Sequence, residues 1–412
     1  MRIHVEYIAV LTAAVCALIL LPMPRSVSAA EWSMQPSVRA GREHDDNIQL
    51  TIQPHNSVMG TMISPRLDLG VSSDIWQITG SAETLHKWYT GQDGLDRDDW
   101  YYNLLTSYNT ERSKWQLTGG ISKSSTLANE QISPTTGFIQ VQKPYDTHSV
   151  SPSWTWAANE LTQLQLVYAF DSVSYVDAQN VGLFDYSSRV SSAQLSYQLT
   201  PSDQIFVSTG YSLFNVPSTT FESKSASYQG GITRTFSETA RGTLSVGKRR
   251  NISEQAALVC TVFLGPSCVQ TTSETLTRKV SNSIYSGSLE KQYQTTNLMI
   301  NFGRTYYPTG VGGEVLTDSL TATLSQQISS QWSANFSVAN YDTKGATINV
   351  SGTNYHLYSI SPGLHWVWAE EWSADLSYRY THVKRELENV PASSNATYLT
   401  VRYVWPKMGI SR

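Results

Sequence analysis

The sequence predicts an all-β protein, a transmembrane antiparallel up-and-down β-barrel of about eighteen strands, with about sixteen as the alternative count. Three observations lead to this fold class. Side chains alternate between apolar and polar with a period of two, tight turns alternate with longer connections, and the composition is rich in aromatic residues but poor in charge.

The final hairpin, residues 371–405, shows the alternation most clearly. The apolar series is Trp372, Ala374, Leu376, Tyr378 and Tyr380 in the first run and Leu399, Val401, Tyr403 and Trp405 in the second. A period of two is that of a β-strand. Because aromatic residues cap the apolar series and the opposite series is small and hydrogen-bonding, we expect lipid on one face and water on the other.

Two kinds of connection alternate along the chain. Tight polar turns lie near residues 72–73, 110–113, 158–160, 201–203, 237–239, 292–295, 329–330 and 370–371. Longer, irregular stretches include 41–56, 90–98, 122–145, 177–184, 251–273 and 343–353. Short periplasmic turns and long outer loops are typical of outer-membrane barrels. A β-helix would need a short fixed repeat, which we do not find, and a secreted all-β enzyme would have no reason to alternate two lengths of connection.

The chain begins with a pattern typical of a secretory signal peptide, residues 1–29. An apolar run over 8–21 precedes Val27-Ser28-Ala29, which offers small residues for cleavage before Ala30. This run is shorter than the ~20 residues of a spanning helix, so a membrane anchor is the weaker interpretation. We expect residues 30–412 to form one barrel in the outer membrane of a Gram-negative bacterium.

The composition is consistent with a location in the outer membrane. Only 15% of the residues are charged, whereas the chain holds 23 Tyr and 12 Trp, the residues that gather at membrane interfaces. The net charge of -4 is too small to indicate a charged partner, and nothing indicates nucleic acid. Once Cys16 is removed with the signal peptide, Cys260 and Cys268 remain, and in an oxidising compartment we expect them to form a disulfide rather than a zinc site or a reactive thiol.

The polar series would line the lumen. Its charged members are Arg66, Asp68, Glu83, Asp171, Arg241, Arg249, Asp375, Arg379 and Arg402. A barrel of this size leaves an aqueous channel, and the slight excess of arginine suggests tolerance for anionic solutes. The alternative is that these charges pair across strands and only stabilise the wall.

Aromatic residues near the short turns predict a periplasmic girdle at the lipid interface. They are Trp76, Trp115, Trp332, Trp366, Trp368, Trp372 and Trp405. Those near the opposite ends form either an outer girdle or a surface that stacks on sugar rings, and they include Trp88, Tyr89, Trp100, Tyr101, Tyr102, Tyr306 and Tyr307.

Catalytic motifs do not stand out. The tight cluster His44-Asp45-Asp46 lies in the first long stretch, but the chain has no Gly-x-Ser-x-Gly elbow and no His-Glu-x-x-His helix. We interpret the cluster as a solvated acidic loop that could touch a divalent cation, and we predict a non-enzymatic protein without cofactors. An outer-membrane hydrolase or an adhesin is the third hypothesis for function.

The two ends of the mature chain resemble a known family. The opening Ser33-Met34-Gln35-Pro36-Ser37-Val38 with Asp46-Asn47-Ile48, and the closing run Tyr398 to Lys407, are similar to outer-membrane β-barrel porins of the second type. The resemblance implies a pore for secreted exopolysaccharide, working with a periplasmic polysaccharide export protein. The alternative is a general diffusion porin for small hydrophilic solutes.

The carboxyl end departs from the usual barrel ending. Many barrels end on an aromatic residue that the barrel assembly machinery reads, whereas here residues 406–412 follow Trp405. We therefore expect Tyr403 and Trp405 to serve as an internal assembly signal.

Overall fold

The computed structural model describes residues 30–52, 55–129, 141–177, 179–264, 267–347, 354–386 and 390–411. The side chains of 128, 129, 179, 257–264, 267–273, 410 and 411 lie outside this description. The predicted signal peptide, 1–29, also lies outside the described residues and stays a prediction.

Nearly all of the described chain is β-strand. The first ten strands are β1 (Glu31–Asp45), β2 (Val58–Ser72), β3 (Trp76–Thr90), β4 (Arg97–Asn109), β5 (Ser113–Ser125), β6 (Pro144–Ala157), β7 (Thr162–Tyr175), β8 (Tyr186–Gln198), β9 (Asp203–Val216) and β10 (Phe221–Ser237). The others are β11 (Ala240–Leu264), β12 (Ser267–Gln292), β13 (Thr296–Thr309), β14 (Gly313–Gln327), β15 (Trp332–Gly345), β16 (Tyr355–Val367), β17 (Trp372–Arg385), β18 (Ala392–Val404) and β19 (Met408–Ser411). The described helices are short: α2 (Thr126–Asn129), η1 (Gln179–Val181) and η2 (Pro217–Thr219).

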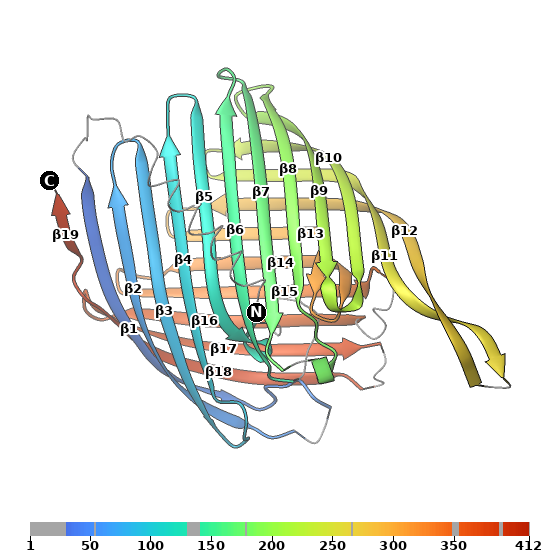
Figure 1. Ribbon diagram of the computed structural model, residues 1–412. Coiled ribbons are helices and arrows are strands. Elements are labelled where there is room, and N and C mark those ends of the chain that lie inside the picture. Colours follow the sequence, from blue (N-terminus) through green and yellow to red (C-terminus); the bar gives the residue numbers. More distant parts are fainter. Residues whose placement is uncertain are drawn as a thin grey trace.

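The sheet closes on itself. Each strand pairs antiparallel with its neighbours in sequence, and β1 pairs with both β2 and β18. The short β19 continues β18 past Pro406 and also pairs with β1 (Figure 1). Since β18 and β19 share one place in the wall, the described strands form an eighteen-stranded antiparallel barrel, which confirms the predicted fold class and count.

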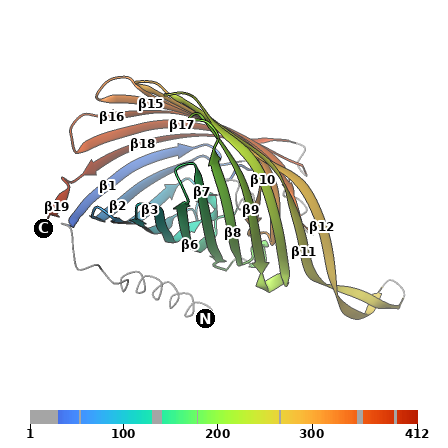
Figure 2. The ribbon, with the colours of Figure 1, turned by 90° about the horizontal axis from the view of Figure 1, so that it is seen from above.

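The long hairpin β11–β12 departs from the expected layout. Residues 251–273 were expected to be irregular, but nearly all of them are strand. The hairpin projects from the wall (Figures 1 and 2), because β10 pairs with β11 only as far as Glu254 and β13 pairs with β12 only as far as Tyr285. The expected disulfide falls in this hairpin. The backbone register sets Cys260 opposite Thr271, and the disulfide itself stays a prediction.

The outward face is apolar and exposed, as for Leu376, Leu399 and Val207. Near the short turns, Trp332 and Trp366 stack with ring centroids 5.2 Å apart, and Trp372 lies 4.7 Å from Tyr403. Aromatic side chains at this level are typical of a lipid interface. Water cannot satisfy an open sheet edge within a bilayer, so a closed barrel with an apolar outer band is a structure suited to span one.

Candidate functional site

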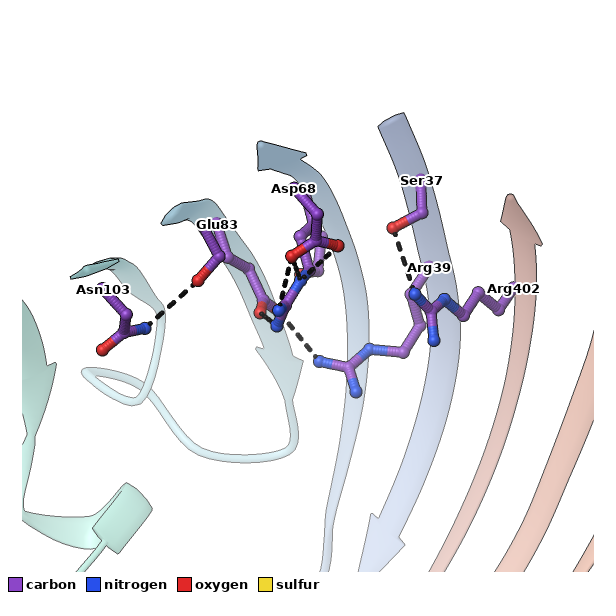
Figure 3. Close-up of polar contacts among 9 residues, drawn as sticks. Ser37, Arg39, Asp68, Glu83, Asn103 and Arg402 are labelled. Carbon is purple, nitrogen blue, oxygen red and sulfur yellow. Dashed lines mark hydrogen bonds and ion pairs between the residues drawn. The ribbon is translucent and has the colours of Figure 1, made fainter. Parts of the chain in front are cut away.

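The lumen wall carries a charged cluster on three neighbouring strands near β18. The arginine–carboxylate cluster consists of Arg39 on β1, Arg66 and Asp68 on β2, and Glu83 on β3 (Figure 3). Glu83 pairs with Arg39 at 3.1 Å and with Arg66 at 3.3 Å. Arg66 also pairs with Asp68 at 2.7 Å. The predicted lumen residues Arg66, Asp68 and Glu83 are therefore brought together.

Arg39 is the member of this cluster that the sequence analysis missed. It shares its strand with Arg42 three residues further on, and an odd spacing places the two on opposite faces. The polar series of β1 is also interrupted by Gly41. The signal that could have identified Arg39 is the apolar pair Val38 and Ala40, which flanks it and points outward.

The next strands add further positive charge. Arg402 on β18 is the register partner of Arg39, and its guanidinium donates to the Ser37 hydroxyl at 3.4 Å (Figure 3). Arg379 on β17 lies over the Tyr398 ring, 4.8 Å from its centroid. The contacts that the structure describes for these two guanidinium groups involve no carboxylate, so this part of the wall is more positive than the cluster beside it.

Other predicted lumen residues lie apart from the cluster. Asp375 on β17 pairs with His365 at 2.7 Å, an imidazole partner that the sequence analysis did not single out. Two more lie on strands further round the barrel: Asp171 on β7 opposite Ser188, and Arg241 on β11 opposite Glu290.

Arg249 belongs to a second polar cluster at the outer end of the barrel, the end opposite the short turns. Its guanidinium pairs with the buried Glu314 carboxylate at 2.7 Å. The same carboxylate accepts from the Ser223 hydroxyl at 2.5 Å and from the Asn251 amide at 2.6 Å. Glu314 thereby joins β14 to the inner faces of β10 and β11, and we call this set the Glu314 cluster.

The tip of the β13–β14 hairpin lies against the inner wall. The Phe184 amide donates to the Gly310 carbonyl at 2.7 Å, and Leu183 packs against Val311. Arg249 lies over the Tyr306 ring at 4.3 Å. Together with the Glu314 cluster, these contacts place residues 306–314 against the β7–β8 loop, β10 and β11, inside the outer end.

The first loop also folds inward. Leu50 is buried against Leu357 and Val383, residues on the inner faces of β16 and β17. The Arg385 guanidinium donates to the Leu50 carbonyl at 2.6 Å, and the Asn47 amide donates to the Ser393 carbonyl at 2.9 Å. The loop therefore narrows the mouth from the side opposite the β13–β14 tip.

A buried ion pair lies beneath this loop. The Lys87 ammonium is 2.5 Å from Glu43, and both side chains are less than a tenth exposed. Arg97 and Asp99, on the next strand, are 3.2 Å apart and similarly enclosed. Charges this deep persist only when paired, so the wall beneath the first loop is packed rather than freely hydrated.

The carboxylates of the acidic cluster near the first loop accept hydrogen bonds from neighbouring residues. The Asp45 carboxylate accepts from the Ser394 hydroxyl at 2.7 Å and from the backbone N–H of Asn47 at 2.8 Å, and the Asp46 carboxylate accepts from the Asn395 side-chain amide. Across the part of the chain that the structure describes, no group of three or more His, Cys, Asp or Glu could hold a metal ion.

An apolar outer band around a polar inner wall defines the class: the protein is a β-barrel of the Gram-negative outer membrane. No protein-family model matches the chain, and no curated protein matches its sequence. The family resemblance seen at the two ends therefore stays a prediction.

Comparison with solved structures returns other outer-membrane proteins. OccAB4 of Acinetobacter baumannii is 9% identical, with 94% of this chain and 100% of that chain covered and a TM-score of 0.47. The ferric-catecholate import receptor Fiu of Escherichia coli K12 is 10% identical, with 93% and 82% covered and a TM-score of 0.46. OccK5 (OpdH) of Pseudomonas aeruginosa is 11% identical, with 91% and 98% covered and a TM-score of 0.44. At these values the likeness gives no argument about solutes or partners.

Proposed function

We propose that the protein is a non-enzymatic diffusion channel for small hydrophilic solutes, with a preference for anions. The single observation that carries this proposal is the combination of a polar wall with a mouth narrowed from two sides. A barrel of this strand number leaves a wide aqueous lumen unless something fills it. Here Leu50 and the β13–β14 tip both occupy its outer end.

The preference for anions rests on Arg402 and Arg379, which lie beside Arg39. Arg39 and Arg402 are register partners, and Arg379 lies one strand away. Glu83 and Asp68 balance the charges of Arg39 and Arg66, whereas Arg402 and Arg379 leave this side of the lumen positive. Rings and rows of arginine favour anions in pores.

Exopolysaccharide export, the main expectation drawn from the family resemblance, gains no specific support. A polymer would have to pass the outer end, where buried side chains such as Leu50 and Glu314 fill space. We therefore favour the small-solute channel. Contacts with the barrel assembly machinery and with a periplasmic export protein remain predictions.

Planar-bilayer recording of the purified mature barrel tests the proposal. We expect stable unit conductance, a reversal potential shifted toward chloride in a KCl gradient, and swelling of liposomes in small carboxylates but not in long oligosaccharides. The proposal would be overturned if the barrel conducted no ions. Loss of surface polysaccharide in a deletion strain that keeps normal small-solute uptake would instead favour export.

A further inference from the structure

The outward face of the barrel is hollowed along β4 to β10. The groove has a volume of about 970 Å³. Most of its lining residues belong to the outward series: Trp115, Leu166 and Tyr211 are exposed there, and the register sets Trp154, Ala193 and Ala226 beside them on the neighbouring strands. The groove therefore opens to the bilayer and not to the lumen.

Small residues and aromatic residues both line this groove. The small lining residues include Ser191, Ala193, Gly210 and Ala226 on β8, β9 and β10. The aromatic lining residues include Trp115, Trp154, Tyr211 and Tyr228, and Tyr228 is 65% exposed. None of the described residues that line the groove carries a charge.

The groove lies at the level of the periplasmic leaflet of the membrane. Trp115 and Trp154 lie close to the short turns at residues 110–112 and 158–161, and their rings stack at 5.5 Å. Tyr228 lies midway along β10. The groove thus runs from the periplasmic interface toward the middle of the bilayer.

We propose that this groove binds the acyl chain of a phospholipid from the periplasmic leaflet. The groove is continuous with the lipid-facing surface and its walls carry no charge. Since no water is present there to solvate polar groups, its occupant must be apolar. Its length from interface to midplane matches a chain whose headgroup stays beside the tryptophans. Indole rings at that level lie where headgroups meet acyl chains.

A second copy of the chain fits the groove less well. In a two-fold dimer the same patch meets itself, so two hollows would face each other and leave a gap. An acyl chain can follow the irregular surface around Ala193 and Ala226 without requiring a matching convex surface. We therefore assign the groove to lipid.

Photo-crosslinking tests the assignment. The purified barrel is reconstituted with phospholipid that carries a diazirine near the end of one acyl chain, and labelled peptides are mapped by mass spectrometry. Labelling is compared per unit of exposed area. We expect the groove segments 152–168 and 191–211 to be labelled more strongly than residues 315–340 of the opposite wall. In Ala193→Trp the indole should fill part of the groove, so that the bound acyl chain buries at least one methylene less. One methylene corresponds to a factor of about four in affinity, so we expect groove labelling to fall about fourfold. Ala193→Leu gives a milder filling if the larger residue impairs assembly.

The control is Ala322→Trp, which adds the same side chain to the outward face of β14 between Ile300 and Val338. It should leave groove labelling unchanged, and heat-modifiable migration must show that each variant is folded. Even labelling around the barrel would overturn the proposal. So would stronger labelling by a photoreactive lipid A, or crosslinks between two copies that exclude the phospholipid.

Discussion

Arg39 on β1 and Glu83 on β3 form an ion pair at 3.1 Å that spans the intervening strand β2. The same carboxylate pairs with Arg66 at 3.3 Å and accepts from the Ser64 hydroxyl at 2.6 Å. The single Glu83 carboxylate thus pairs with two guanidinium groups in the lumen. Neutralising Glu83 or Arg39 should therefore change the charge of this wall by one unit in opposite directions.

Glu83→Gln should make the channel more selective for anions. The change removes the negative charge but keeps the size of the side chain, so Arg39 and Arg66 lose part of their neutralisation. We expect the ratio of chloride to potassium permeability to rise roughly two- to fivefold, which corresponds to about 0.4 to 1 kcal/mol. Reversal potentials in a KCl gradient measure it.

Arg39→Gln is the matched control and should shift selectivity the opposite way. The Arg39 side chain is 43% exposed, so its ion pair should contribute little to stability, about 0 to 1 kcal/mol. If both variants kept the wild-type permeability ratio, the cluster would lie outside the path of the ions. The anion preference would then have to come from Arg402 and Arg379.

Glu314→Gln should loosen the β13–β14 tip and raise unit conductance. The charged acceptor of Arg249, Ser223 and Asn251 is replaced by an amide that cannot satisfy all three donors. We expect larger and noisier open-channel currents in single-channel recordings, because the tip no longer stays against the inner wall.

Asp318→Asn supplies the control on the same strand. Asp318 pairs with Arg304 at 2.6 Å on the outward series, away from the lumen. It should leave conductance unchanged. Wild-type currents for Glu314→Gln would show that the tip is held by its apolar contacts alone, such as Leu183 with Val311.

The barrel follows from the alternation because lipid and water select opposite residue types at every second position. The same alternation puts Arg66, Glu83 and Arg402 in one polar series, and the register then makes Arg402 a neighbour of Arg39. The tight turns also predict the strand count, since each of them joins two strands and one further strand lies at each end of the chain.

Tyr306 and Glu314 show where the alternation stops predicting contacts. Both fall on the series of Phe302 and Leu320, which point outward. Their side chains nevertheless meet Arg249, because β13 separates from β12 beyond Arg304 and the hairpin tip then crosses the inner wall. That separation depends on tertiary packing, which a local period does not encode. The inward fold of Leu50 was unpredictable for the same reason.

Lys87→Met should destabilise the barrel strongly. It leaves the Glu43 carboxylate buried without its ammonium partner at 2.5 Å. Breaking a buried pair from one side typically costs about 3 to 5 kcal/mol. We expect a lower midpoint temperature for the change in electrophoretic migration of unboiled samples. The double variant Glu43→Gln with Lys87→Met removes both charges and should recover much of the loss; equal loss in both variants would contradict a charge effect.

Trp405→Ala should reduce the amount of assembled barrel if Tyr403 and Trp405 act as the internal assembly signal. Their rings are 4.7 Å apart at the end of β18, on the lipid-facing surface, and Trp405 is followed by Pro406 and the short β19. Trp366→Ala is the matched control, because it removes an equally exposed indole from the same girdle without touching the last strand. We expect less folded, heat-modifiable protein in outer membranes for Trp405→Ala than for Trp366→Ala. Equal defects would mean that the girdle needs both rings for anchoring, and that Trp405 carries no separate signal.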